Sequence, residues 1–354
     1  MGHGSKKEAR RGATASALLI ALAVFAWADS RKAESARASL FKGGTAHGSP
    51  PSRSSDDPSS SFGRAAKAAA RPAGATRSLP SFARFREVSG RGLIVKVWID
   101  GAGPFDFAVD TGAGSTILST RVAQAARVSV AADRAVDISG LSGARRANAR
   151  EASVRSIAVG AANNLLPGRG SIIVADALPP DLDGVLDPSE TFYPLGYVID
   201  FRAGVIRAFD PRTAPLRRDE APPGGDTVAW LTEGGTRRPF VALEGGRRAL
   251  VDTGSGLGLG LTPEAARALG VVGGGGRVRE GGVRDLGRGQ VQARRIEPAT
   301  VRIGALVLRR VPTDLLAGAS AGAPAILGRD ALRPFELTFD PLNRLIRFAP
   351  YPRS

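Results

Sequence analysis

The sequence predicts a mostly β protein built from two similar lobes, each with one short helix. An apolar, strand-like stretch that ends in aspartate, threonine and glycine occurs at residues 105–114 and again at 248–256. At the same spacing after each aspartate a threonine opens a short helical stretch, and each half of the chain closes with a pair of apolar strands. The matched segments are 105–114 with 248–256, 120–126 with 262–269, 183–186 with 325–328, and 197–207 with 335–348. Agreement segment by segment indicates an internal duplication.

Asp110 and Asp252, the last residues of the repeated strands, are the candidate catalytic groups. A carboxylate at the end of a buried strand is costly unless it is hydrogen-bonded or paired. The neighbouring residues suit that need, because a threonine hydroxyl can anchor the loop and a glycine lets backbone N–H groups approach the carboxylate. One such loop is ordinary turn chemistry, but two in matched positions indicate a site. The candidate supporting residues are Thr111, Gly112, Ala113, Thr253, Gly254 and Ser255.

The types of residue in the lobes exclude several kinds of catalytic and metal site. The 354 residues include no cysteine and only two histidines, His3 and His47, both ahead of the first lobe. Thiol nucleophiles, disulfides, a Ser-His-Asp triad and a zinc site with histidine or cysteine ligands are therefore excluded there. We expect the acid–base chemistry to use carboxylates, with no metal and no cofactor.

The formal net charge of +16 does not predict nucleic-acid binding. About half of this charge lies in residues 1–80, and the remainder is almost entirely arginine spread along both lobes. A groove for nucleic acid also needs interleaved aromatic side chains for stacking, and these make up only 6% of the residues. The charge pattern is typical of a solvated surface.

The doubled Asp-Thr-Gly-Ala/Ser motif at Asp110 and Asp252, with a later apolar-apolar-Gly element, resembles the aspartic protease superfamily. Within it, the chain is similar to retropepsin-like and pepsin-like proteins, and to bacterial members with both lobes in one chain. The resemblance covers roughly residues 91–350. It implies two β-barrel-like lobes related by a pseudo-twofold axis, a monomer, a peptide or protein substrate, and a catalytic dyad of Asp110 and Asp252. One departure is Asp187, which stands where lobe two has Gly328.

The family covers its substrate with a hairpin flap. The candidate flap in this chain consists of Ser139, Gly140, Leu141, Ser142 and Gly143. Its glycine-rich tip between polar strands suits a mobile flap, and it suits an ordinary surface hairpin equally well. No aromatic residue occurs between residues 127 and 150, so a flap tyrosine of the pepsin type is missing.

The two half-sites differ at the third residue after each aspartate. The hydroxyl of Ser255 can donate a hydrogen bond to Asp252, which would favour the ionised form, whereas Ala113 has no such group for Asp110. We expect Asp252 to be the ionised member of the pair and Asp110 the protonated one.

The domain organisation follows from composition. A basic flank precedes an uncharged run at residues 12–28 that ends in Ala-Trp-Ala, which predicts a secretory signal or, if it is not cleaved, a membrane anchor. Either reading places the lobes outside the cytoplasm. The stretch that follows is rich in Ser, Ala, Pro, Gly and Arg, which is typical of a disordered tether or of a propeptide. The predicted segments are the signal or anchor at 1–28, the tether at 29–80, lobe one at 81–212, a linker at 213–225 and lobe two at 226–354.

Two functions fit these observations. The first is an exported aspartic endopeptidase that hydrolyses peptide bonds with a water activated between Asp110 and Asp252. The second is a catalytically weak, peptide-binding protein of the cell envelope with the same lobes, which Asp187 and the missing flap aromatic favour.

Overall fold

The computed structural model describes residues 25–26, 78–143, 145–170, 172–176, 178–233, 235–271, 282–284, 290–320 and 322–352. The predicted signal or anchor, apart from residues 25–26, and the predicted tether, apart from residues 78–80, lie outside the described residues. No helix among the described residues is long and apolar enough to cross a membrane.

The chain is mostly β, which confirms the fold class predicted from the sequence. The first lobe contains β2 (Ala83–Val88), β3 (Gly92–Ile99), β4 (Ala102–Val109), β5 (Thr116–Leu118), α2 (Thr120–Ala125), β6 (Ser129–Ser139), β7 (Arg145–Ser153), β8 (Ile157–Val159), β9 (Ile172–Val174), β10 (Gly184–Leu186), α3 (Pro188–Thr191), β11 (Gly196–Asp200) and β12 (Val205–Phe209). The two-residue strand β1 (Phe25–Ala26) pairs with the end of β6.

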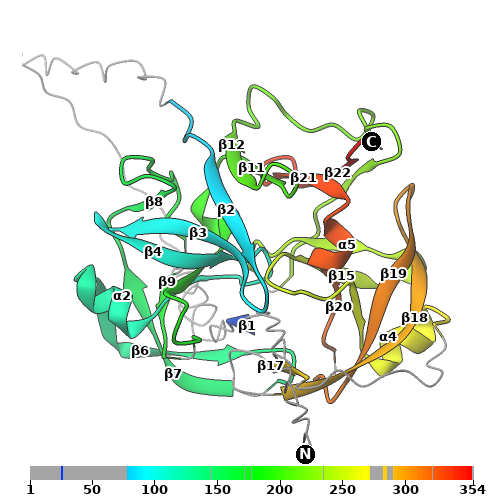
Figure 1. Cartoon of the computed structure of the whole chain (residues 1–354), viewed down its shortest axis with the longest axis horizontal. Helices are drawn as coiled ribbons and strands as arrows, with labels where there is room; N and C mark the ends of the chain where they lie inside the picture. The colour runs from blue at the N-terminus through cyan, green and yellow to red at the C-terminus, as the bar shows by residue number, and fades with distance from the viewer. Residues whose placement is uncertain are drawn as a thin grey trace, which may run out of the picture. The chain divides into compact units, whose positions relative to one another are not determined.

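The second lobe contains a similar series of elements. It contains β13 (Asp226–Ala229), β14 (Phe240–Ala242), the 3-10 turn η1 (Glu244–Gly246), β15 (Arg248–Asp252), β16 (Leu259–Leu261), α4 (Pro263–Ala268), β17 (Val283–Arg284), β18 (Gln290–Ile303), β19 (Leu306–Ala317), β20 (Ala325–Gly328), α5 (Arg329–Leu332), β21 (Phe335–Asp340) and β22 (Leu345–Pro350). Figure 1 shows lobe one in cyan and green beside lobe two in yellow and orange.

The strand that carries each aspartate has the same neighbours in both lobes. In lobe one, β4 pairs in parallel with β10, and β10 pairs antiparallel with β5. In lobe two, β15 pairs in parallel with β20, and β20 pairs antiparallel with β16. Because the pairings repeat, both aspartate loops leave the same kind of sheet at the same point.

Both short helices begin at polar caps, Ser119 nine residues after Asp110 and Thr262 ten residues after Asp252. Ser119 caps α2 by accepting a hydrogen bond from the backbone N–H of Val122. Thr262 caps α4 by accepting one from Ala265, with proline at the first helical position. Serine and threonine are preferred at this position because they satisfy an N–H that the helix leaves open.

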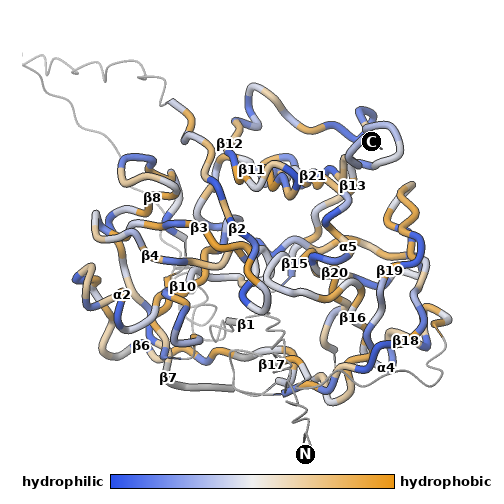
Figure 2. Tube along the Cα trace, in the orientation of Figure 1, coloured by the Kyte–Doolittle hydropathy of each residue, from blue (hydrophilic) through white to orange (hydrophobic). Residues whose placement is uncertain are grey.

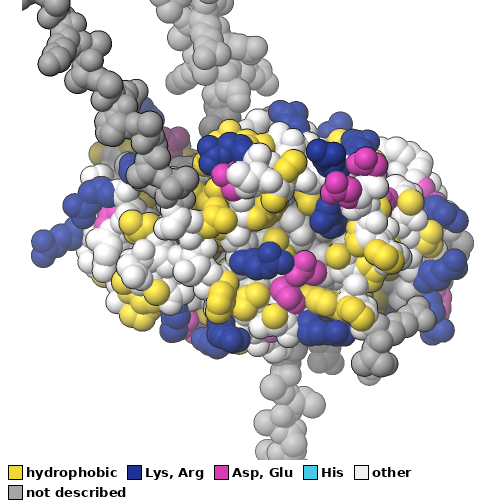
Figure 3. Space-filling model, turned by 90° about the horizontal axis from the view of Figure 1, so that it is seen from above, with side chains coloured by type: hydrophobic (Ala, Val, Ile, Leu, Met, Phe, Trp, Pro, Cys, Tyr) yellow, Lys and Arg dark blue, Asp and Glu magenta, His cyan; other side chains and the backbone are white. Residues whose placement is uncertain are grey.

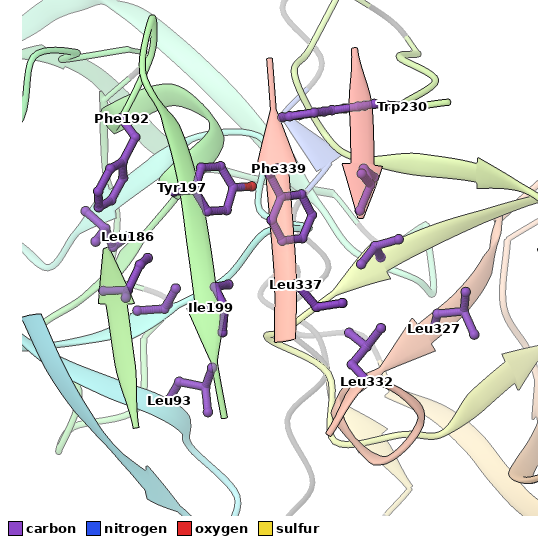
Figure 4. Packing of buried hydrophobic residues seen from close by; sticks show 14 of the residues in the cluster. Leu93, Leu186, Phe192, Tyr197, Ile199, Trp230, Leu327, Leu332, Leu337 and Phe339 are labelled. Carbon is purple, nitrogen blue, oxygen red and sulfur yellow. The ribbon is translucent and has the colours of Figure 1, made fainter. Parts of the chain in front are cut away.

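A shared sheet joins the lobes. Its strands run in the order β2, β12, β11, β21, β22 and β13, and the central pair, β11 with β21, brings one closing strand from each lobe together. Across this pair the rings of Tyr197 and Phe339 stack with centroids 4.6 Å apart (Figure 4). Both rings are fully buried in a core that reaches from Leu93 in lobe one to Leu327 in lobe two. Aromatic burial at this seam fixes the lobes against each other.

Hydrophobic and charged residues are distributed as expected for a β protein with alternating faces. Figure 2 shows hydrophobic stretches in strands near the middle of the molecule, with hydrophilic residues mixed in along the loops. On the face in Figure 3, lysine and arginine side chains are scattered, and acidic and apolar side chains lie between them. The part of this face that is drawn in colour carries no continuous basic patch.

Candidate active site

The two aspartate loops leave the ends of β4 and β15 and meet between the lobes. The threonines of the repeated motif join them. The Thr111 hydroxyl donates to the carbonyl of Val251 (2.6 Å), and the Thr253 hydroxyl donates to the carbonyl of Val109 (3.0 Å). Each hydroxyl also accepts the backbone N–H of the other threonine, at 3.1 and 3.2 Å. Four reciprocal, buried hydrogen bonds therefore hold the loops in register across the lobe boundary.

The glycines of the motif let the two carboxyl groups approach. A Cβ atom on Gly112 would lie 2.8 Å from the carboxyl carbon of Asp252. A Cβ atom on Gly254 would lie 2.3 Å from Oδ2 of Asp110. Each glycine thus lies against the aspartate of the opposite lobe, so any side chain there would push the carboxyl groups apart.

Each carboxyl group is held through one oxygen. The backbone N–H of Gly112 donates to Oδ1 of Asp110 (2.7 Å), and the backbone N–H of Ser255 donates to Oδ1 of Asp252 (3.0 Å). Both aspartates are fully buried, and no other described residue donates a hydrogen bond to their Oδ2 atoms. A single proton shared between the two carboxyl groups supplies the missing donor, because the protonated group can donate a hydrogen bond to the ionised one.

The pKa shifts of the two aspartates agree with one shared proton. Burial raises the pKa of Asp110 well above its usual value, and the neighbouring Asp252 charge raises it further. Burial also raises the pKa of Asp252, but the hydrogen bond with Asp110, backbone N–H groups and the cation of Arg329 act in the opposite direction. Because two like charges in one buried site repel each other, the pair favours a state that holds a single shared proton.

A comparison with protein families finds a match in lobe one, around Asp110. Residues 95–179 match a family model described as aspartyl protease. Within these residues of lobe one, the chain is similar to aspartyl proteases. Among solved structures, it is similar to an aspartic proteinase from Irpex lacteus, at 12% sequence identity and a TM-score of 0.47, covering 76% of this chain and 97% of that chain. No curated protein matches the chain.

The predicted supporting residues lie in the two aspartate loops, but Ser255 acts differently from the expectation. Its hydroxyl does not donate to Asp252; it accepts the backbone N–H of Leu257 (3.3 Å). Asp252 receives the backbone N–H of Ser255 instead. The effects that oppose the increase in the pKa of Asp252 are the hydrogen bond with Asp110, backbone N–H groups and the Arg329 cation, and the serine hydroxyl is not among them. Ala113 is buried beside Asp110 and contributes packing.

Arg329 is a member of the site that sequence reasoning missed. It is the first residue of α5, and its side chain is only 6% exposed. Its Nη1 donates to the carbonyl of Thr253 (2.6 Å) and to that of Gly254 (3.0 Å), while Nε donates to Glu87 of lobe one (3.2 Å). A buried cation thus supports the Asp252 loop from behind and connects it to the other lobe. The signal was present in the sequence, since Arg329 directly follows the glycine of the apolar-apolar-Gly element.

Arg238 is a second buried cation beside the site. It comes from the loop before β14, and its Cδ lies 3.2 Å from where a Cβ on Gly114 would be. The desolvated guanidinium has a pKa below its usual value, and the charges of Glu233, Asp187, Asp252 and Asp110 act against that decrease. Lobe two therefore places a positive charge next to the loop of lobe one.

Asp187, which stands where lobe two has Gly328, is the N-cap of α3. Its Oδ1 accepts the backbone N–H of Ser189 (2.9 Å), and the residue is fully buried. Burial raises its pKa to about 8, with the charge of Glu190 adding to the increase. The same carboxyl group adds to the increase in the pKa of Asp110. Where lobe two supports its loop with Gly328 and Arg329, lobe one has a third carboxyl group that is protonated at neutral pH.

We expect Asp187→Asn to flatten the pH dependence of stability. The native pKa of about 8 exceeds the unfolded value of about 3.9, so between these pH values the native state keeps a proton that the unfolded state has released. The free energy of unfolding of the parent therefore falls as pH rises through this window, by up to about 1.4 kcal/mol per unit from this group. Asparagine keeps the cap and does not titrate. Thermal unfolding of both proteins from pH 4 to 8 checks this; parallel curves would contradict it.

The candidate flap lies at the turn between β6 and β7. Gly140 and Leu141 are buried, Ser142 is half-buried and Gly143 is exposed, while Ser139 ends β6. The hairpin tip contacts lobe two, because the backbone N–H of Ser320 donates to the carbonyl of Leu141 (2.8 Å).

Among the described residues, no group of three or more acidic, histidine or cysteine side chains is placed to hold a metal ion.

Proposed function

We propose that the protein is an aspartic endopeptidase that hydrolyses peptide bonds with a water molecule activated between Asp110 and Asp252. The observation that carries the proposal is the juxtaposition of two buried carboxyl groups, each held through Oδ1 and each with an Oδ2 atom that no described residue donates to. Threonine hydroxyls from both lobes fix this arrangement before substrate binds. Preorganised polar groups in a buried site act strongly on charge that develops during reaction.

The proposed reaction uses one proton shared by Asp110 and Asp252, and all proton transfers balance over the cycle. Ionised Asp252 takes a proton from the water as its oxygen attacks the carbonyl carbon, and protonated Asp110 donates its proton to the carbonyl oxygen. The tetrahedral diol then collapses, because the proton now on Asp252 passes to the leaving nitrogen and Asp110 recovers its proton from the diol. The carbon–nitrogen bond breaks without an acyl-enzyme, and the dyad returns to its starting state.

The test of this function is digestion of a peptide library between pH 3 and 7, with and without a statine-containing inhibitor. Statine carries a hydroxyl group on tetrahedral carbon, which stands in for the diol, so the proposal expects cleavage that the inhibitor abolishes. Cleavage that persists with saturating inhibitor would assign the activity to another site or to a contaminant.

The second candidate function is a catalytically weak, peptide-binding protein of the cell envelope with the same lobes. Asp187 favours it, because a third buried carboxyl group behind the Asp110 loop departs from the pattern of lobe two. Binding of the statine-containing inhibitor without cleavage of any library peptide would support this candidate over the protease.

We further propose that the protein acts as a monomer outside the cytoplasm. Both half-sites lie in one chain, so no second copy is needed to complete the site. The basic flank and apolar run at residues 12–28 support export or membrane attachment. Mass spectrometry of the mature N-terminus, with fractionation of the producing cells, distinguishes a cleaved signal from an anchor.

A further inference from the structure

Exposed apolar side chains lie together where the described part of the chain enters lobe one. Among the described residues six large apolar side chains are exposed, and three of them lie in this region: Leu79 (47% exposed), Phe82 (57%) and Leu165 (57%). Leu79 and Phe82 come shortly before β2, whereas Leu165 lies in the loop after β8 (Figure 1). Single exposed apolar side chains are normal on a soluble protein, but several together indicate a contact surface.

Asn164 holds these two segments together. Its side-chain oxygen accepts the backbone N–H of Ser81 (2.7 Å), and its side-chain nitrogen donates to the carbonyls of Ser81 (2.9 Å) and Val159 (2.7 Å). Phe82 directly follows Ser81, and Leu165 directly follows Asn164. The hydrogen bonds of one asparagine therefore keep both apolar residues at one place on the surface of lobe one.

Two cations lie beside these apolar residues, around a surface pocket. Arg84 of β2 and Lys96 of β3 line this pocket of about 380 Å³, together with Phe82, Asn163 and Asn164. Both cationic side chains are exposed, and the guanidinium carbon of Arg84 lies 5.8 Å from the centre of the Phe82 ring. Cationic and apolar groups thus share one small part of the surface.

The charge around the pocket is positive. Asp106 of β4 lies 2.9 Å from the ammonium group of Lys96 and 3.4 Å from the guanidinium group of Arg86. Three cations, Arg84, Arg86 and Lys96, and this one carboxylate leave an excess of two positive charges. A phosphate group suits such a pocket, because its oxygens can accept charge-assisted hydrogen bonds from more than one cation.

The place of this surface in the chain indicates its partner. The uncharged, apolar run at residues 12–28 predicts a secretory signal or a membrane anchor. The chain that leads from this run enters the described structure at residue 78, next to Leu79. Apolar side chains with cations at their edge are typical of a surface that lies in the interface of an anionic bilayer, where the cations attract the lipid headgroups. Both observations favour a lipid surface over a soluble partner.

We propose that Leu79, Phe82 and Leu165, with Arg84 and Lys96, form a docking surface for an anionic membrane, and that headgroup phosphates enter the pocket that the two cations line. The docking surface goes beyond the proposed function, because it needs no part of the aspartate pair. If the run at residues 12–28 is retained as an anchor, the docking surface holds lobe one against the bilayer. If the run is cleaved, the docking surface is itself the means of attachment.

The experiment places a fluorescent reporter on the docking surface of the full chain. The sequence contains no cysteine, so an environment-sensitive dye can be attached at Asn163→Cys alone. Phosphatidylcholine vesicles with about one-third phosphatidylglycerol should shift the dye emission to the blue, whereas pure phosphatidylcholine vesicles should shift it much less. The same dye at Leu342→Cys, in the turn between β21 and β22, should not respond, although this residue is also exposed. Because the reporter is local, insertion of residues 12–28 alone does not imitate docking.

The contributions of charge and apolar contact are measured separately. Arg84→Gln with Lys96→Gln should reduce the ratio of docked to undocked protein, determined from the emission, about 25-fold, since each cation at an anionic surface contributes a factor of about five. Lys96→Gln alone should give about a fivefold reduction, which keeps the test usable if the double variant is misfolded. Phe82→Ser with Leu165→Ser should reduce the same ratio at least about tenfold, because less apolar surface leaves water.

A matched control removes the same charge elsewhere. Arg248→Gln with Arg309→Gln changes two exposed cations of lobe two and should change the ratio of docked to undocked protein by less than about twofold. An emission that anionic vesicles leave unchanged, an equal shift with neutral vesicles, or an equal loss in this control would overturn the docking surface. A matching shift with inorganic phosphate or with soluble polyglutamate would also overturn it, because the partner would then be a free anion or an acidic protein.

Discussion

Replacing Asp110 or Asp252 with asparagine is expected to reduce kcat/KM for peptide cleavage by at least about a thousandfold. Each aspartate supplies half of one proton-sharing unit, so neither works alone. The same substitutions should not lower the melting temperature at neutral pH, because burial disfavours the charged form of both carboxyl groups and asparagine carries no charge. Kinetics on one peptide and thermal unfolding of each variant measure both expectations.

The double variant and a matched control sharpen this test. Because the two groups act as a unit, the double asparagine variant should be no slower than the slower single variant, rather than slower by the product of the two losses. Asp181→Asn is the control, since that carboxyl group is 58% exposed and lies outside the site. Either single variant retaining a tenth or more of the parent activity would contradict the dyad.

Replacing Arg329 with methionine is expected to cost about 3 kcal/mol of folding stability. The substitution leaves the buried carbonyls of Thr253 and Gly254 without their donor, while the methionine still fills the space. The part of the loss that comes from Glu87 is small, because that carboxylate is one-third exposed and screened by solvent. The variant should also move the acid limb of the pH–rate profile upward, because the Arg329 cation lowers the pKa of Asp252.

Arg333→Met is the matched control for this prediction. Arg333 contacts the same carboxylate, Glu87, but is 51% exposed and does not reach the Asp252 loop. Its replacement should change the free energy of unfolding by less than about 0.5 kcal/mol and leave the pH profile unmoved. Denaturant unfolding measures the free energy of unfolding of both variants. Equal losses of this free energy in Arg329→Met and Arg333→Met would mean that the carbonyl contacts of Arg329 contribute nothing to stability.

The repeated part of the architecture could be predicted from the sequence, because it depends on local patterns that occur twice. The aspartate loops, the capped helices and the closing strand pairs all combine apolar periodicity with turn or cap residues at fixed spacing. The glycines next to Thr111 and Thr253 were expected to permit close approach. The structure shows that the approaching group is the carboxyl group of the opposite lobe.

The features of the site that the sequence did not predict depend on contacts between segments far apart in the chain. The spacing of residues along the sequence does not encode these contacts. Arg329 reaches the Asp252 loop and Glu87 only because α5 and β2 pack together at the lobe boundary. The hydroxyl of Ser255 accepts the backbone N–H of Leu257, and Asp252 receives the backbone N–H of Ser255 instead. The burial of Leu141 against residues of lobe two depends on contacts between the lobes, and the sequence of its hairpin fitted a surface loop equally well.

The pH dependence of kcat/KM on a single peptide tests the central claim most directly. The account predicts a bell-shaped profile: activity falls at low pH as Asp252 gains a proton, and falls at high pH as Asp110 loses the proton that it must donate. The alkaline limb should lie well above the usual carboxyl pKa, because burial and the Asp252 charge raise the pKa of Asp110. A statine-containing inhibitor should bind over the same pH range. Activity that keeps rising through pH 8, or that does not depend on pH between 3 and 8, would contradict a single proton shared by Asp110 and Asp252.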